Sequence, residues 1–382
     1  MKKSKIVRSV VILGLVSFFT DLASEMLYPI TPLFLTSVLG ASMASVGIIE
    51  GIAEITAGLL KGYFGSLSDK LGKRSIFVII GYGISGLVKP LPGLIPHYTA
   101  VLFSRVADRV GKGIRTAPRD ALLASYADGN SGAVFGFHRS MDTFGAVAGP
   151  LAAIGVLYFI PNGYKTIYLL SIIPSMFAIY FTFLVKDKKG TVKIKQKSNM
   201  LNFWKNAPRQ YKFLTVCLTL FSLANSSDVF LILKSKDIAK SDVIAIMGYV
   251  FYNFIYAALS YPVGMIADRY GKKKVFISGL FIFSIVYMGF ALGSSFAMMW
   301  VLFALYGLYA AASEGVTKAW VSDLIPGELR GTAIGLITMC ISLAAMFGSV
   351  LTGVLWDSFG SQIPFVISSV VSVIIAVLLL KI

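Results

Sequence analysis

The chain is poor in the residue types that build metal centres and redox sites. It has two cysteines and two histidines in 382 residues. Cys217 and Cys340 both lie inside apolar runs, and neither they nor His97 and His138 fall at a metal-ligand spacing. A glycine-rich phosphate loop followed by Lys and Ser or Thr is also missing, which excludes nucleotide hydrolysis as an energy source. We therefore expect no metal, no cofactor and no catalysed reaction.

Charge is scarce and mostly of one sign. Charged residues make up 14% of the chain, with 18 acidic against 35 basic side chains and a formal net charge of +17. A basic excess is typical of nucleic-acid binding, so the positions of the basic residues decide its meaning. Hydrophobic residues make up 56% of the chain, and the mean hydropathy is +0.78. This composition is typical of a chain that meets lipid over most of its length, so we expect an all-α integral membrane protein.

Apolar runs of about 20 residues, the length needed to cross a bilayer, predict twelve transmembrane helices. The fourth is the weakest by hydropathy because charged residues fall in its middle. The first has a short basic start but no small-residue cleavage signal, so we interpret it as a membrane span and not as a signal peptide. The spans lie near 8–38, 44–66, 75–95, 98–127, 132–159, 164–185, 211–235, 242–266, 274–293, 296–323, 331–356 and 362–381.

The basic residues gather on alternate loops. If the N-terminus is cytoplasmic, the inside segments hold most of them, and the outside loops hold only Lys165, Lys234, Lys236 and Lys240. This positive-inside bias predicts a multi-pass protein of the cell membrane with both termini in the cytoplasm. Nucleic acid is not needed to explain the charge.

A short charged segment, which we interpret as a loop between two apolar runs, occurs twice. Residues 65–74 read Gly-Ser-Leu-Ser-Asp-Lys-Leu-Gly-Lys-Arg, and residues 264–274 read Gly-Met-Ile-Ala-Asp-Arg-Tyr-Gly-Lys-Lys-Lys. Asp268 follows Asp69 by 199 residues, and the glycines keep the same register. Any cytoplasmic loop collects basic residues, but that alone does not reproduce this order twice. The positions singled out are Gly65, Asp69, Lys70, Gly72, Lys73 and Arg74, and then Gly264, Asp268, Arg269 and Gly271.

The repeat divides the chain into two halves. Gly132 and Gly136 match Gly331 and Gly335 at the same offset, so a helix is expected at both places. The stretch between the halves is basic and lacks apolar periodicity, except for a surface-lying helical piece expected near residues 201–204. The predicted boundaries are 1–185 for the N-terminal six-helix half, 186–210 for the cytoplasmic linker and 211–382 for the C-terminal six-helix half.

The repeated segment resembles motif A of the major facilitator superfamily, which joins the second and third helices in each half of those transporters. The resemblance spans the full chain, and residues 108–120 and 137–143 are similar to a largely uncharacterised prokaryotic branch. It implies two pseudo-symmetric six-helix halves and a monomer in the lipid bilayer that carries a small solute by alternating access. In the superfamily, the first copy of motif A latches helix eleven and closes the cytoplasmic side.

Charged residues inside the predicted spans cluster on helices one, two and four. Placing a charged side chain at membrane depth costs at least about 2.5 kcal/mol of insertion free energy. Such a residue normally marks a transport pathway or belongs to an ion pair. At 100° per residue, the charges of helix four share one face, where Asp108 has Arg105 and Lys112 as expected partners. The alternative is structural, with Arg115 and Arg119 reaching the headgroups. The candidates for proton coupling are Asp21, Glu25, Glu50, Glu54, Arg105, Asp108, Arg109 and Lys112.

Two segments resemble further motifs of the superfamily but match them only in part. The motif B arginine, which is implicated in proton coupling in related transporters, matches either Arg109 or Arg105, and the choice stays open. Gly145 and Gly149 resemble the start of the antiporter motif C, but its trailing glycines are missing and this spacing is also ordinary close helix packing.

The C-terminal half offers a polar and aromatic wall. Side chains on helix eight lie within about 100° of arc, and two charges on helix ten are spaced to pair as i, i+4. Such a wall suits an amphipathic or aromatic solute, although a tyrosine stripe is often packing alone. The wall candidates are Asn225, Asp228, Tyr249, Tyr252, Asn253, Tyr256, Glu314 and Lys318; at the start of helix five, His138, Arg139 and Asp142 are expected to form a gate or interface network.

These features favour a transporter that carries a small solute by alternating access with proton coupling, including efflux by antiport. A second hypothesis is an uncoupled facilitator or exporter of amphipathic compounds or lipids. A third is a membrane receptor or assembly factor that kept the fold and lost transport. Neither the substrate nor the direction of transport follows from the sequence.

The charge bias predicts which side of the membrane each loop faces. After both native cysteines are replaced by serine, a cysteine at Gly190 should react with an impermeant maleimide only from the cytoplasmic side, and a cysteine at Asn162 only from outside. Labelling of intact cells and of inverted vesicles measures both. The opposite pattern would overturn the assignment of the termini.

Overall fold

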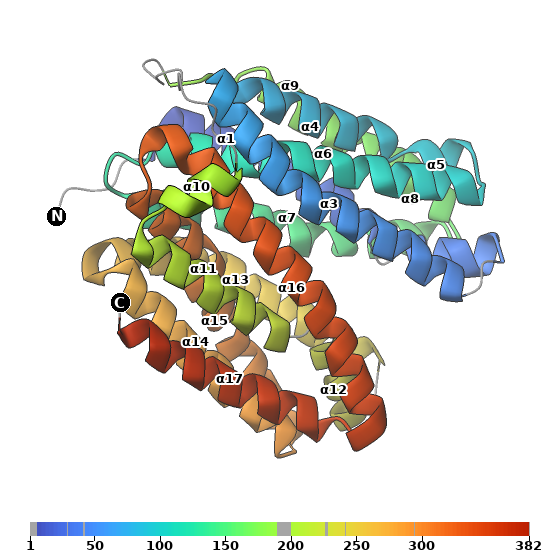
Figure 1. The fold of residues 1–382 in the computed structure, drawn as a ribbon. Coiled ribbons are helices and arrows are strands. Elements are labelled where there is room, and N and C mark those ends of the chain that lie inside the picture. Colours follow the sequence, from blue (N-terminus) through green and yellow to red (C-terminus); the bar gives the residue numbers. More distant parts are fainter. Residues whose placement is uncertain are drawn as a thin grey trace. The chain divides into compact units, whose positions relative to one another are not determined.

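The computed structural model describes residues 6–28, 30–40, 43–188, 200–225, 228–240, 242–293 and 295–381. Within these ranges every regular element is a helix (Figure 1). The chain divides into two compact units, each with its own interior. Unit 1 comprises Met1–Tyr126, Met141–Phe203 and Pro326–Leu336, and unit 2 comprises Ala127–Ser140, Trp204–Ile325 and Ile337–Ile382.

The helices follow one another through short connections. The first half of the chain contains α1 (Arg8–Leu27), α2 (Ile30–Leu33), the π-helix η1 (Phe34–Val38), α3 (Met43–Leu71), α4 (Ser75–Val88), α5 (Leu91–Leu94), α6 (Tyr98–Ser125), α7 (Ser131–Phe159), α8 (Tyr164–Leu170) and α9 (Ile172–Thr182). The second contains α10 (Met200–Asn206), α11 (Arg209–Ala224), α12 (Asp228–Ala239), α13 (Asp242–Tyr270), α14 (Lys272–Ala291), α15 (Phe296–Leu324), the 3-10 helix η2 (Gly327–Leu329), α16 (Arg330–Phe359) and α17 (Gln362–Leu380).

Each of the twelve expected spans is occupied by one helix or by consecutive helices along the chain. Nine segments of the described residues are long and apolar enough to cross a membrane. The charge-rich fourth span is the 28-residue helix α6, as the repeat predicted. The linker contains α10, where a short helix was expected.

Two of the spans are broken in ways that matter for the site. In the third, Pro90 lies between α4 and α5, where its missing N–H ends the hydrogen-bond ladder. In the seventh, α11 ends at Ala224 and the backbone of Asn225 is extended, with φ −83° and ψ 114°. The chain is helical again from Asp228.

In unit 1, α3 and α4 pack against the charged helix α6 (Figure 1). Glycines permit this close approach: the nearest atoms to a Cβ added at Gly81 would be Cβ of Arg115 and the carbonyl oxygen of Gly111, each 2.6 Å away. Because α6 is covered on these sides, the two basic side chains of its C-terminal half lie in the interior of the unit. Arg115 is 5% exposed and Arg119 is 7% exposed.

The structure corrects the expectation that these two arginines extend to the headgroups. The guanidinium of Arg115 lies over the ring of Tyr82, 4.2 Å from its centroid. Arg119 pairs with Asp120 at 2.9 Å and donates to the Tyr82 hydroxyl at 3.2 Å. Tyr82 on α4 gives both arginines a partner inside the unit, so they need not reach water.

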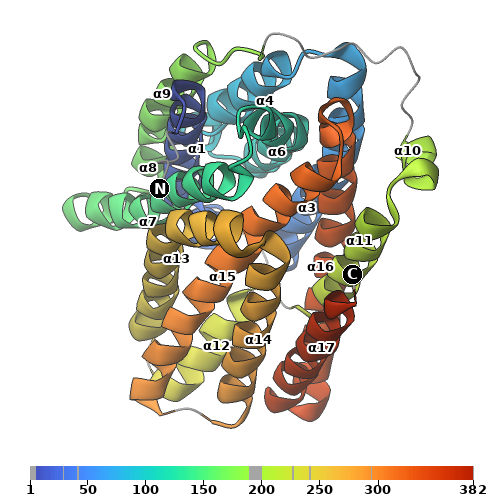
Figure 2. The same cartoon turned by 90° about the vertical axis from the view of Figure 1, so that its left-hand side faces the viewer.

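In unit 2, α14 lies at the centre of an aromatic core and contacts α15 and α17 (Figure 2). Phe283 stacks on Tyr287 with 4.0 Å between ring centroids, and Tyr309 lies 4.8 Å from Phe283. Phe290 continues the cluster toward Phe303 and Phe365. Aromatic pairs of this kind add to the stabilisation from burial alone.

Gly81→Ala should destabilise the protein because the added methyl group must push α6 away from α4. We expect a loss of about 1–3 kcal/mol, which is the usual cost of overpacking, seen as a lower melting temperature in detergent. Gly83→Ala on the same helix is the matched control, because a Cβ there meets nothing within 4 Å and alanine is the better helix former. Equal melting temperatures for the two variants would contradict this packing.

Candidate functional site

The two copies of the repeated segment are helical, which corrects the expectation of a loop. α3 continues to Leu71 and α13 to Tyr270. Each helix ends only at the second glycine of its copy, where Gly72 has φ +61° and Gly271 has φ +100°. A glycine in this left-handed region is a common helix terminator because it has no Cβ to clash. The sequence interpretation mistook charged helix ends for a loop.

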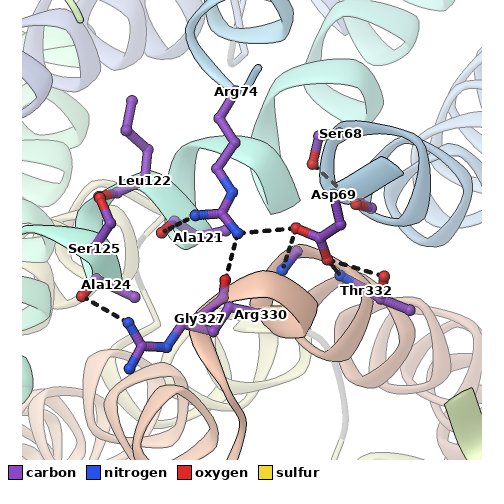
Figure 3. A network of polar contacts seen from close by, with 12 residues as sticks. Ser68, Asp69, Arg74, Ala121, Leu122, Ala124, Ser125, Gly327, Arg330 and Thr332 are labelled. Atoms are coloured by element: carbon purple, nitrogen blue, oxygen red, sulfur yellow. Dashed lines mark hydrogen bonds and ion pairs between the residues drawn. The ribbon is translucent and has the colours of Figure 1, made fainter. Parts of the chain in front are cut away.

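In the first copy, Asp69 accepts hydrogen bonds from the first turn of α16, as Figure 3 shows. The backbone N–H groups of Gly331 and Thr332 donate to its two carboxylate oxygens at 3.2 and 2.6 Å, and the Thr332 hydroxyl donates at 2.9 Å. Asp69 is 3% exposed. A carboxylate here satisfies backbone donors that have no partner within their own helix, and it lies at the positive end of the helix dipole.

Arg74 ties this contact to the neighbouring helices. It pairs with Asp69 at 2.9 Å and donates to the carbonyl oxygens of Gly327 at 2.6 Å and Ala121 at 3.3 Å. Arg330 donates to the carbonyl oxygen of Ala124 at 3.2 Å (Figure 3). The start of α16 is therefore held by the ends of both α3 and α6.

The second copy makes the equivalent contact within unit 2. Asp268 accepts the N–H groups of Gly132 at 2.8 Å and Ala133 at 2.7 Å, in the first turn of α7. The cation here is Lys272, which bridges Asp268 at 2.9 Å and Asp323 at 2.6 Å.

The first glycine of each copy permits close backbone approach. A Cβ on Gly65 would overlap the carbonyl oxygen of Gly331, and one on Gly264 would overlap that of Gly132. The remaining predicted positions take no part in these contacts: Lys70 and Lys73 are exposed, and the guanidinium of Arg269 lies 5.2 Å from the Tyr270 ring centroid.

Asp108 on α6 pairs with a residue that the sequence interpretation missed. Its partner is Lys89, at 3.1 Å, and the Ser85 hydroxyl also donates to it. Lys89 is 2% exposed and donates in addition to the Ser85 carbonyl oxygen at 3.2 Å. A lysine in the otherwise apolar third span was a visible signal. The helix-wheel argument looked for partners on α6 itself, whereas the ion pair joins α4 to α6.

A small cavity of about 20 Å³ opens beside this pair, which is room for about one water molecule. Polar groups from several helices line it, and the Thr31 and Tyr168 hydroxyls lie 2.9 Å apart. Its lining is Ser24, Leu27, Thr31, Lys89, Pro92, Val101, Ser104, Arg105, Asp108 and Tyr168.

Close packing of α1 on α7 brings two carboxyl groups together. A Cβ at Gly145 would come within 3.2 Å of Cβ of Asp21, and one at Gly149 within 2.8 Å of Cβ of Glu25. The carboxyl groups of Asp21 and Asp142 lie within hydrogen-bonding reach of each other. The sequence allowed two interpretations of this glycine spacing, the start of motif C or close helix packing, and the structure shows the close packing.

Helix one also meets the basic face of α6. Glu25 lies within electrostatic reach of Lys112, Arg109, Arg105 and Asp142. Arg105 and Arg109 therefore both belong to this cluster, and the choice between them as the motif B arginine stays open. The side chains of Glu50 and Glu54 lie outside the described residues.

In unit 2, the break in the seventh span lies against tyrosines. Asp228 accepts hydrogen bonds from the hydroxyls of Tyr306, at 2.7 Å, and Tyr252. The Tyr287 hydroxyl donates to the side-chain oxygen of Asn225 at 3.4 Å. The sequence interpretation did not name Tyr306, on α15, or Tyr287, on α14, among the wall residues.

Arg139 forms a second polar group in unit 2. It pairs with Glu314 and donates to the Tyr256 hydroxyl, and that hydroxyl donates to Glu314 at 2.9 Å. Glu314 thus pairs with α7, where the sequence predicted Lys318 as a partner. Asn253 is buried and donates to the carbonyl oxygen of Tyr249 at 3.0 Å, one turn earlier on α13.

The sequence model of the Major Facilitator Superfamily matches residues 13–237 and again 213–382. The chain belongs to this superfamily. A relative from Methanocaldococcus jannaschii, described as an uncharacterised transporter of the superfamily, is 35% identical over 98% of this chain and 94% of its own length.

Solved structures of superfamily members share the fold of this chain. The Escherichia coli fucose:proton symporter superposes with a TM-score of 0.79 and 14% identity, covering 97% of this chain and 98% of the symporter. A human organic anion transporter gives a TM-score of 0.77 and 15% identity, covering 97% of this chain and 99% of that one. The chain is thus a multi-pass membrane protein with the twelve-helix superfamily fold. At this identity, the likeness shows the fold and not the substrate.

Asp69→Asn should release the start of α16 while the fold is kept. The amide retains one acceptor oxygen, so one backbone N–H of α16 loses its partner and Arg74, which is 4% exposed, loses its counter-ion. Ala333 is fully buried, so a cysteine placed there in a serine-substituted background should react with maleimide much faster in this variant than in the parent.

The matched control for Asp69→Asn is Asp128→Asn, which changes an exposed carboxylate and should leave the labelling rate at position 333 unchanged. A melting curve on each variant separates local release from unfolding. An unchanged labelling rate in Asp69→Asn would show that the carboxylate does not hold α16.

Proposed function

We propose that this chain carries a small solute across the membrane by alternating access and couples the movement to protons. The supporting observation is the pair formed by Asp21 and Asp142, whose carboxyl groups lie within hydrogen-bonding reach in unit 1. Two carboxylates this close repel each other unless a proton is held between them. The pair is therefore a place where one proton binds.

The surroundings of the pair favour reversible binding of that proton. The Ser17 hydroxyl donates to Asp142, so one oxygen is stabilised in its ionised form. Lys112 is the cation that acts most strongly on Asp21. Approach of a cation favours release of the proton, and its withdrawal favours uptake. A movement of α6 relative to α1 and α7 would therefore bind or release the proton.

Alternating access also requires contacts that form and break. We infer that the two aspartates of the repeated segment are latches, because each holds the start of a helix through backbone hydrogen bonds that are lost if that helix end moves. Asp69 holds α16 and Asp268 holds α7. In this proposal both latches face the cytoplasm, where the basic ends of α3 and α13 match the positive-inside bias.

We place the protein in the cell membrane as a monomer with both termini in the cytoplasm, and its partners are the solute, protons and lipid. Proton coupling is also named for the fucose:proton symporter that shares the fold. We also propose that the N-terminal half ends at residue 185 and that the C-terminal half begins at residue 211.

Asp21→Asn and Asp142→Asn should each abolish proton-driven accumulation of a solute chosen by thermal-shift screening, while exchange of labelled for unlabelled solute continues. The amide keeps the volume of the side chain but has no proton to exchange, and only the coupled step needs that proton. Both modes are measured in proteoliposomes beside a melting curve. Asp237→Asn, an exposed carboxylate on α12, is the control and should keep both modes.

A purely structural pair predicts a different pattern, in which stability and both transport modes fall together, because breaking a buried polar contact costs roughly 3–5 kcal/mol when a charge is left unpaired. Normal proton-driven accumulation in both single variants and in the double variant would exclude the pair from coupling. In the parent, solute flux without proton flux would indicate an uncoupled facilitator, and the absence of both would indicate a receptor or assembly factor.

A further inference from the structure

The break in the seventh span collects groups that attract positive charge. α11 ends at Ala224, and Asn225 leaves the helix with an extended backbone. The C-terminal end of a helix carries the partial negative charge of the helix dipole. Broken membrane helices of transporters use such ends to bind cations. Asp228, four residues after Ala224, adds a full negative charge.

Asp228 has no ion-pair partner among the described residues. Its recorded hydrogen bonds come from the neutral hydroxyls of Tyr252 and Tyr306. Arg139 is a cation whose charge acts on Asp228, but it is itself paired with Glu314. Carboxylates inside a membrane protein are normally neutralised by a partner, and here the described residues offer Asp228 neutral hydrogen-bond donors but no ion pair.

Aromatic rings of α13 and α15 cluster around the two tyrosines that donate to Asp228. The Tyr252 ring lies 5.0 Å from that of Tyr306 and 5.3 Å from that of Tyr249, and it stacks on Phe303 at 6.4 Å. Tyr309 follows at 5.5 Å from Tyr306. The faces of aromatic rings are negative and bind organic cations, above all quaternary ammonium groups.

These observations point to one class of ligand. The carboxylate, the C-terminal end of α11 and the ring faces all favour positive charge. The rings also supply apolar area for carbon substituents on the charged centre. We propose that the start of α12 and the tyrosines packed against it form the binding site for an organic cation, with Asp228 as its counter-ion and the rings of Tyr249, Tyr252 and Tyr306 as its wall.

The inference rests on the proposed function because it names the solute class of that transporter. A structural role for Asp228 is the competing explanation, since an acidic residue in the first turn stabilises a helix, and Asp228 begins α12. In that case its removal would lower stability without changing the binding of any ligand. A binding measurement therefore separates the two roles.

The test is calorimetric titration of the purified full chain, in a neutral detergent, with tetraphenylphosphonium as the probe. Tetraphenylborate has the same shape and the opposite charge, so it controls for binding by apolar area alone. We expect the phosphonium to bind and the borate not to bind. Asp228→Asn should weaken phosphonium binding by about tenfold or more, whereas Asp237→Asn on the same helix should leave it unchanged.

One further variant tests the wall. Tyr306→Phe keeps the ring and removes one hydroxyl, so binding should change much less than in Asp228→Asn. If Asp228→Asn does not fold, protection of Asp228 from carbodiimide modification by the phosphonium, read by mass spectrometry in the parent, replaces it.

Equal binding of phosphonium and borate, equal affinity in Asp228→Asn and the parent, or no protection of Asp228 would each overturn the cation site. Those results leave the proposed function intact if proton-coupled transport of another solute is found. Conversely, phosphonium binding that depends on Asp228, together with no proton movement in proteoliposomes, would support the cation site and count against coupling.

Discussion

A carboxylate that accepts backbone N–H groups at the start of a helix is the contact on which this structure depends. It occurs with Asp69 on α16 and with Asp268 on α7. Asp187 does the same for α4, accepting from the N–H groups of Arg74 and Ser75 at 2.9 and 3.1 Å. The first N–H groups of a helix have no partner inside it. An aspartate from another segment supplies that partner and fixes the helix end in one step.

The spacing of the repeated segment follows from this contact. The carboxylate reaches the N–H groups only if the two helices approach closely, which requires Gly65 or Gly264 one turn earlier. The helix must then stop within a turn, which Gly72 and Gly271 achieve at positive φ. The order of glycine, aspartate and glycine is therefore a geometric requirement. The basic residues beside it can differ in which of them pairs with the aspartate. Arg74 is the cation in one copy and Lys272 in the other.

Much of the fold could be predicted from the sequence, but little of the side-chain pairing. Apolar length and the 199-residue repeat suffice to place the helices, because both are properties of the chain alone. Pairing depends on how far one helix is shifted along another, and a helix wheel carries no such information. It looked for partners of Asp108 on the same helix, whereas the partner is Lys89 at the end of α4. It assigned Asp142 to a gate or interface network but could not show that close packing at Gly145 sets α7 against Asp21 on α1.

The two halves of the sequence have diverged in the chemistry of their interiors while keeping the same latch. In unit 1, the carboxyl groups of Asp21 and Asp142 lie among basic side chains, where we propose that one proton binds. In unit 2, one carboxylate, Asp228, lies among tyrosines. Coupling between a proton and a solute requires that both bias the same conformational equilibrium. In the proposed mechanism, the contacts of Asp69 and Asp268 set that equilibrium. Each joins a helix of one half of the sequence to a helix of the other, and a shift of either helix end changes its hydrogen bonds. A transporter built this way needs no direct contact between its proton and its solute.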